Sequence, residues 1–155
     1  MKKLQKLTIL FCLLILTNCG FQLSSLETNY KILEINTNGD KKINYKLKTK
    51  VSATSKENNN NLIKLNINTK KNKTIKEKNI SNQVTKYEIN IICSVEYKSL
   101  NDKKEGSFTI LKRGDYSVSS KYSDTLNNEK NLINSLVNNI SEEIIDNLTS
   151  NFNDL

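Results

Sequence analysis

The sequence predicts an α+β fold, a two-layer sandwich in which two helices pack on one face of a mostly antiparallel four-stranded sheet. Two observations favour this fold. A stretch in the middle of the chain alternates apolar and polar residues over about eleven positions, as a half-buried antiparallel strand does. The last third of the chain, and a shorter segment near residue 45, repeat apolar residues at the spacing of amphipathic helices.

The first elements expected along the domain are a strand and a helix. Residues 30–35, YKILEI, are short and carry enough β-branched residues to form a strand. An Asn-Gly-Asp turn ends this strand, and Asp40 is expected to cap the helix that follows. The helix is predicted over about residues 40–55, with lysines on its polar faces. Its apolar face is marked by residues four positions apart, namely Ile43, Leu47 and Val51.

Three strand signals follow a polar, Asn-rich loop. Residues 62–69 alternate apolar and polar side chains, and the next segment, KKNKTIKEKNISNQ, is expected to form a basic hairpin or a long loop. The clearest alternation runs over residues 86–100, and the turn NDKKEG then leads to a fourth strand at residues 107–111. The side of the clearest strand that we expect to be buried consists of Tyr87, Ile89, Ile91, Cys93, Val95 and Tyr97.

A long amphipathic helix is predicted from about residue 126 to residue 150, with Asp124 or Thr125 as its cap. The elements therefore follow the order β-α-β-β-β-α in a single domain over residues 30–155. The apolar face of the final helix consists of Leu132, Ile133, Leu136, Val137, Ile140, Ile144, Ile145 and Leu148.

The chain begins with a basic segment and a short apolar run. Residues 1–6 carry three lysines and no acid, and Leu7–Leu16 is apolar apart from one threonine and one cysteine. Such a run is about half as long as a membrane-spanning helix, which needs roughly 20 residues. This pattern predicts a secretory signal peptide over residues 1–18. The alternative is a buried N-terminal helix or a short membrane anchor.

The end of this leader resembles a bacterial lipobox, the sequence at which lipoproteins are lipidated and cleaved. Leu16 and Thr17 occupy the expected positions before Cys19, while Asn18 stands where Gly, Ala or Ser is usual. We expect Cys19 to be the lipid-attachment site, carrying an S-diacylglycerol and an N-palmitoyl group, because the reaction needs a thiol nucleophile. Three acyl chains would give firm membrane anchoring, and residues 19–29 would form a tether. The alternative is an incidental cysteine behind an ordinary leader.

Composition excludes several classes of function. Without histidine the chain has no Ser-His-Asp or Cys-His system and no imidazole metal ligand, and its four glycines form no phosphate-binding loop. We expect no metal, no cofactor and no enzyme activity. The alternative is a secreted enzyme with a carboxylate site at Asp102, Glu105 and Asp115, but these acids lie on or near turns, where acids are normally solvated. The net charge of +8 is compatible with nucleic acid or anionic lipid as a partner, and also with a composition that is simply rich in lysine. The export signal, and the apolar setting of Tyr87 and Tyr97, argue against nucleic acid.

The residues after the leader resemble a known family. The opening CGFQL, the central stretch QVTKYEINIICSVEY and the stretch GDYSVSSKYSDTLNNEKNLINSLVNNISEEIIDNL together resemble LptE, the lipopolysaccharide-assembly lipoprotein family. The resemblance covers nearly the whole chain after Cys19. Family members commonly carry Arg after this opening, whereas this chain has Ser24.

The resemblance implies a protein without catalysis. It implies an outer-membrane lipoprotein of a Gram-negative bacterium, on the periplasmic side, that plugs an LptD-type β-barrel and assists its assembly. The barrel would insert lipopolysaccharide into the outer leaflet, and this protein would bind lipopolysaccharide itself. The alternative is another non-enzymatic periplasmic envelope lipoprotein, either an adaptor or a binding module.

Basic residues are the expected lipopolysaccharide contacts, because phosphates on lipid A attract lysine and arginine. The positions that the family uses fall near Ile80 and Leu126, and neither residue is basic here. We therefore expect contacts from neighbouring cations, together with a basic pair at the end of the fourth strand. These candidates are Lys76, Lys78, Lys112, Arg113, Lys121 and Lys130.

Overall fold

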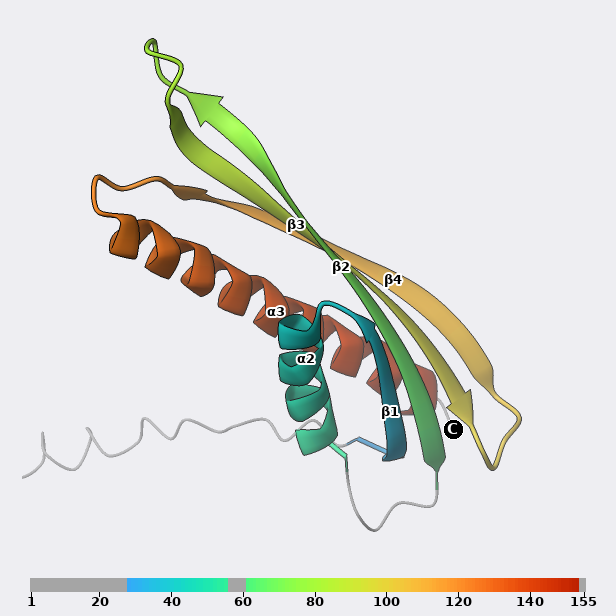
Figure 1. Cartoon of the computed structure of the whole chain (residues 1–155). Coiled ribbons are helices and arrows are strands. Elements are labelled where there is room, and N and C mark those ends of the chain that lie inside the picture. The colour runs from blue at the N-terminus through green and yellow to red at the C-terminus, as the bar shows by residue number, and fades with distance from the viewer. Residues whose placement is uncertain (1–27, 56–60, 154–155) are drawn as a thin grey trace, which may run out of the picture.

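The computed structural model describes residues 28–55 and 61–153, so the leader, Cys19 and the CGFQL opening lie outside the described residues. It confirms the predicted α+β fold and the order β-α-β-β-β-α (Figure 1). The elements are β1 (Lys31–Gly39), α2 (Lys41–Ala53), β2 (Leu62–Lys78), β3 (Val84–Ser99), β4 (Glu105–Ser117) and α3 (Tyr122–Asn153). None of the helices in these ranges is long and apolar enough to cross a membrane.

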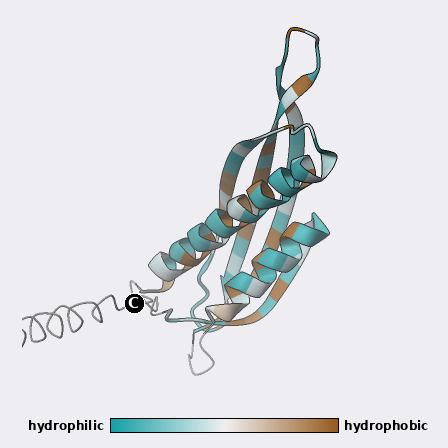
Figure 2. Cartoon of the chain, turned by 90° about the vertical axis from the view of Figure 1, so that its left-hand side faces the viewer, coloured by the Kyte–Doolittle hydropathy of each residue, from teal (hydrophilic) through white to brown (hydrophobic). Residues whose placement is uncertain are grey.

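The strands form one sheet in the order β1-β2-β3-β4. The crossover through α2 brings β1 alongside β2 in parallel, while β2, β3 and β4 follow one another as antiparallel neighbours. Both helices lie on the same face of the sheet, and their hydrophilic sides point away from it (Figures 1 and 2). The sheet is therefore mostly antiparallel, as predicted, and it has one packed face and one open face.

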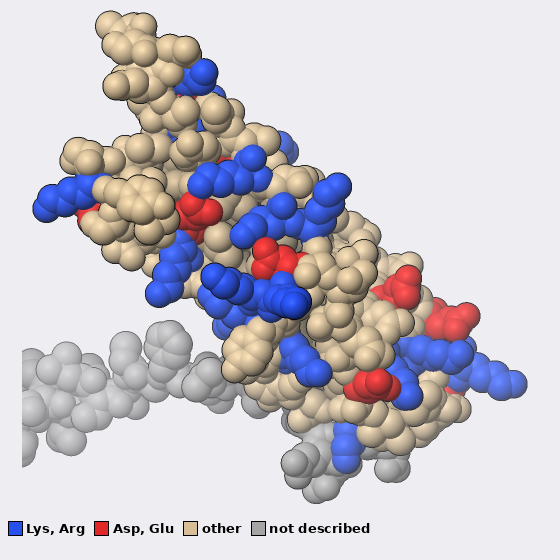
Figure 3. All heavy atoms as spheres, viewed as in Figure 1, with Lys and Arg blue, Asp and Glu red and all other residues tan. Residues whose placement is uncertain are grey.

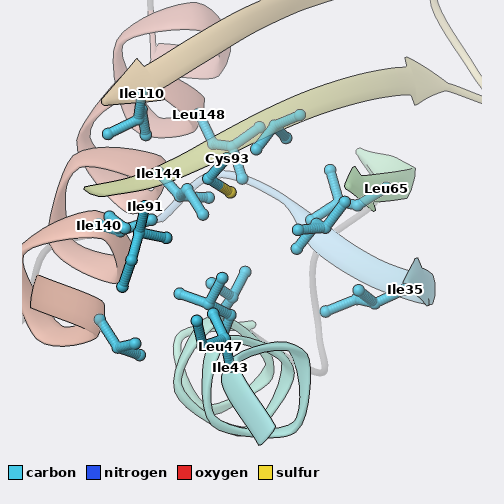
Figure 4. Close-up of a cluster of buried hydrophobic side chains, with 14 of the residues drawn as sticks. Ile35, Ile43, Leu47, Leu65, Ile91, Cys93, Ile110, Ile140, Ile144 and Leu148 are labelled. Carbon is cyan, nitrogen blue, oxygen red and sulfur yellow. The ribbon is translucent and has the colours of Figure 1, made fainter. Parts of the chain in front are cut away.

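The core fills the space between the helices and the sheet. Ile91 on β3 lies beside Ile140 and Ile144 of α3, and Cys93 lies on the same face of the strand (Figure 4). All four are buried. Burial raises the pKa of the Cys93 thiol to about 12, so this cysteine is neutral and packs as a small apolar side chain.

A tight junction joins β1 to α2. Gly39 adopts φ +102°, and a Cβ atom built on it would lie 1.9 Å from the Thr69 carbonyl oxygen of β2. Asp40 caps α2 as predicted, because its side chain accepts hydrogen bonds from the backbone N–H of Lys42 (3.0 Å) and Ile43 (3.1 Å). The junction ends β1 beside Thr69 and starts α2 at the same point.

β2 is longer than its alternating pattern predicts. The expected strand ended at residue 69, but β2 continues through Lys70–Lys78 and forms a hairpin with β3 that projects past the start of α3 (Figure 1). Of the two structures expected for this basic segment, the hairpin is the one observed. Its turn is ordered by the Asn79 side chain, which accepts hydrogen bonds from the backbone N–H of Ser81 (3.0 Å) and Gln83 (2.9 Å).

The other boundaries differ modestly from expectation. β4 runs to Ser117 instead of ending at residue 111, because it stays paired with β3 as far as Lys86. The expected cap at Asp124 or Thr125 is wrong, since α3 begins at Tyr122 and both residues lie in its first turn. The Thr125 hydroxyl instead accepts a hydrogen bond from the backbone N–H of Ser119, in the connection that leads into the helix.

Candidate functional site

A groove lies between the start of α2, the first half of α3 and β2. It has a volume of about 580 Å³. The turn at Gly39 and Asp40 places the N-terminus of α2 beside β2, and the packing of α2 against α3 closes the opposite side. The groove is lined by the cations Lys41, Lys42, Lys46, Lys71 and Lys130, by the acids Asp40 and Glu129, and by apolar side chains.

The electrostatics of this groove are positive. Both acids are engaged by lysines, Asp40 by Lys71 at 3.3 Å and Glu129 by Lys73 at 2.6 Å. Among the residues that the structure describes, no carboxylate forms an ion pair with the other cations, Lys41, Lys42, Lys46 and Lys130. The first turn of α2 also carries no acid, so lysines stand at the positive end of the helix dipole. Basic groups gather where α2 begins beside α3 (Figure 3).

Apolar side chains lie among these cations. Tyr45 is 74% exposed and Leu126 is 47% exposed, and both line the groove together with Ile43 and Ile133. Large exposed apolar side chains therefore lie next to cations that have no carboxylate partner among the described residues, and the Lys46 ammonium donates to the Asn134 side chain. An anionic amphiphile requires these two kinds of contact, one charged and one apolar.

Glu129 joins the groove to the β2–β3 hairpin. Its Oε2 accepts hydrogen bonds from the Lys73 ammonium (2.6 Å) and from the Tyr116 hydroxyl (2.7 Å). The Lys73 ammonium also lies 4.4 Å from the ring centroid of Tyr87. Burial acts to raise the pKa of Glu129, but the hydrogen bonds from Lys73 and Tyr116 outweigh it and hold the pKa below its ordinary value. Glu129 is therefore ionised at neutral pH.

Glu129→Gln is expected to lower the free energy of unfolding at neutral pH by about 1 kcal/mol, because it removes a partly buried charged hydrogen-bond acceptor. The folded pKa of Glu129 lies below its ordinary value of 4.5, so the stabilisation by the ionised carboxylate is complete above that value. It is lost as the pH falls through the folded pKa. Urea unfolding from pH 7 to pH 3 should show the two proteins converge in acid. Glu142→Gln, on the exposed side of α3, is the control and should change little at any pH.

The structure does not bring the six predicted contact residues together. Only Lys130 lines the groove. Lys76 forms an ion pair with Asp115 on β4 (2.7 Å), and Lys78 donates to Asn82 in the hairpin turn (2.9 Å). The remaining three are also dispersed: Lys112 forms an ion pair with Glu143 on α3, Arg113 lies exposed on β4, and Lys121 lies exposed just before α3.

Sequence reasoning missed Lys41, Lys42, Lys46 and Lys71 as members of one site. The first three belong to the predicted helix, where they were expected only to cover its polar faces, and Lys71 lies beyond the predicted end of its strand. The one local signal was Asp40 at the start of the helix, because an acid there marks where the positive end of the helix dipole lies.

The open face of the sheet is polar and nearly neutral. Its central rows carry amide, hydroxyl and paired charged side chains: Asn36 donates to Asn66 (3.4 Å), and the Ser94 and Thr109 hydroxyls lie 3.1 Å apart. The cross-strand pair Ile92 and Leu111 adds an apolar spot to this face, where Leu111 is 56% exposed. Within residues 28–55 and 61–153, no cluster of acids and cysteines is arranged to hold a metal ion.

This architecture is shared with a class of small bacterial lipoproteins of known structure. The crystal structure of rare lipoprotein B from Shewanella oneidensis matches with a TM-score of 0.59 at 13% identity, covering 76% of this chain and 95% of that one. The solution structure of an uncharacterized lipoprotein B from Nitrosomonas europaea matches with a TM-score of 0.53 at 13% identity, covering 81% and 86%. At these identities the likeness shows the fold alone. No protein-family model and no curated protein matches the sequence.

Proposed function

We propose that this protein is an outer-membrane lipoprotein of the LptE type, anchored through Cys19 and acting in lipopolysaccharide assembly without catalysis. Two independent lines support the proposal. The leader, the lipobox-like end and the CGFQL opening resemble the family in sequence. The fold is the one seen in bacterial lipoproteins of known structure.

The observation that carries lipopolysaccharide binding is the groove, because it combines unpaired cations with exposed apolar side chains. Lipid A presents phosphates next to acyl chains, so its head needs both kinds of contact at once. Lys41, Lys42 and Lys130 provide charge for phosphate, while Tyr45 and Leu126 provide apolar surface. The five candidate cations outside the groove would then have lesser roles, such as attracting the anionic ligand from a distance.

Partnership with an LptD-type barrel is supported by the open face of the sheet. The lumen of a large outer-membrane barrel is polar. A plug therefore needs a polar surface, and the amide and hydroxyl rows around Asn66 and Ser94 supply one. The helix-bearing side, with the groove, would then remain available to lipid.

Lipopolysaccharide binding can be tested with charge reversals in the groove. Lys42→Glu combined with Lys130→Glu should weaken binding of purified lipopolysaccharide by about tenfold or more, because two favourable charge contacts become repulsive. Lys98→Glu combined with Lys103→Glu makes the same change in net charge at exposed positions where β3 meets β4, and should change affinity less than about twofold. Fluorescence titration in detergent would measure both. Equal losses would show unspecific charge attraction and would contradict a site in the groove.

The barrel partnership can be tested by affinity purification from outer membranes. The acylated protein should co-purify with a large outer-membrane β-barrel. Cys19→Ser should lose labelled fatty acid and should no longer fractionate with the outer membrane. Absence of any barrel from the purified wild-type protein, with normal surface lipopolysaccharide after its depletion, would instead favour a general envelope adaptor.

A further inference from the structure

We propose that the free edge of β2 between Lys71 and Ile75 is a docking site for an extended, acidic segment of a partner protein, which adds to the sheet as a further strand. The inference does not depend on lipopolysaccharide binding. It is carried by three properties of this segment: which backbone groups face outward, why nothing in the described chain covers them, and the charge of the side chains around them.

The outward-facing backbone groups follow from the register. The backbone N–H of Leu100 donates to the Leu62 carbonyl at 2.8 Å, so Leu62 directs its backbone groups toward β3. The pairing of β2 with β3 keeps one register from Ile63 to Ile75. In an antiparallel pair, alternate residues bond the neighbour and those between them face away. The N–H and C=O groups of Lys71, Lys73 and Ile75 therefore point to the other edge.

In the first half of β2, from Leu62 to Thr69, the same edge pairs with β1. There, the odd-numbered residues face β1, as the Thr69 carbonyl oxygen does where it lies against Gly39. Pairing with β1 stops at Gly39 and Thr69, because the chain turns into α2. All nine residues of Lys70–Lys78 are exposed. Within the described residues, no hydrogen bond joins the backbone of Lys71, Lys73 or Ile75 to another segment on this side.

The charge of Lys70–Lys78 indicates what kind of strand would bind at this edge. Lys70–Lys78 contains five lysines and one glutamate. Lys71, Lys73 and Lys76 already pair with acids at the start of α2, on α3 and on β4, while Lys70 and Lys78 form no ion pair with a described carboxylate. A second copy would bring the same lysines against these, and such like-charged edges repel one another. A strand carrying Glu or Asp would instead place its carboxylates beside lysines while its backbone pairs with the free groups. The edge also borders the groove at Lys71, so an added strand has open space beside it.

The proposal can be tested by nuclear magnetic resonance on the full chain in detergent. The probe is a short, blocked synthetic peptide in which Glu alternates with Thr, and the matched peptide carries Lys at each Glu. Saturation with the acidic peptide should slow hydrogen exchange of the Lys71, Lys73 and Ile75 amides by about tenfold or more. The Asn72 and Thr74 amides, which already bond β3, should change far less. The Lys peptide should not bind.

Ile75→Pro provides a test of the backbone contact. Proline removes an outward N–H and leaves the bonds to β3 in place, so it should weaken binding of the acidic peptide by about tenfold. Ile75→Thr keeps the N–H and removes the same apolar side chain, and should bind nearly as wild type. Preserved exchange protection on Asn72 and Thr74 in the free Ile75→Pro protein would establish that the hairpin is intact.

Three results would overturn the proposal. The first is binding of the acidic peptide without protection of the Lys71, Lys73 and Ile75 amides, which would mean attraction to the lysines alone. The second is equal binding of the acidic and basic peptides. The third is unchanged affinity in Ile75→Pro with the hairpin intact.

Discussion

Gly39→Val is expected to lower the free energy of unfolding by about 3 kcal/mol or more, which is the largest single effect we predict for a residue outside the core. Two causes add. The backbone of Gly39 has φ +102°, a conformation that β-branched residues rarely adopt, and the new side chain would meet the Thr69 carbonyl oxygen. Because Thr69 is held by the core strand β2, the clash can be relieved only by separating β1 from β2.

Urea unfolding followed by circular dichroism would measure the change. Asn38→Val is the matched control, since it adds the same side chain one residue earlier, at an exposed strand position, and should change stability by less than about 0.5 kcal/mol. A Gly39→Val protein as stable as the control would contradict the close approach of β1 to Thr69.

Ile91→Ala is expected to lower the free energy of unfolding by about 3 kcal/mol, because it leaves a cavity between β3 and α3 beside Ile140 and Ile144 (Figure 4). Ile92 is the matched control. It is next in the chain, has the same side chain and faces the open side of the sheet, where it is only partly buried. Ile92→Ala should cost about 1 kcal/mol. Equal losses at the two positions, measured by urea unfolding, would contradict the assignment of the faces of β3.

Much of the fold could be predicted because its strongest signals are periodic. The alternation through Ile89, Ile91 and Cys93 marked β3, and the helical spacing around Ile140 and Ile144 marked α3. The second half of β2 could not be found in this way. Residues 70–78 are almost all polar, so nothing in their own pattern distinguishes a strand from a loop. Pairing with β3, which is a contact between segments, makes them a strand.

The groove was harder to predict than the fold, for a related reason. Its cations come from α2, β2 and α3, and each of them resembles an ordinary solvated lysine in its own segment. They become one site only when β1 and β2 pair in parallel and the turn at Gly39 places Lys41 and Lys42 beside Lys71. The resemblance to LptE directed attention to Lys130 on α3, but it gave no indication of the lysines that α2 and β2 contribute.

The two halves of β2 differ in how much sequence change they can accept. The half up to Thr69 must fit β1, β3 and α2 at once, so its side chains are confined by volume and by register. The half from Lys70 onward packs against β3 and the few residues of α3 near Glu129. Its other contacts are ion pairs made by partly exposed lysines, Lys71 with Asp40 and Lys76 with Asp115. Lengthening or shortening the hairpin by matched residue pairs near its turn would preserve the alternation of faces. The length of the β2–β3 hairpin can therefore change while the packing of the core stays the same.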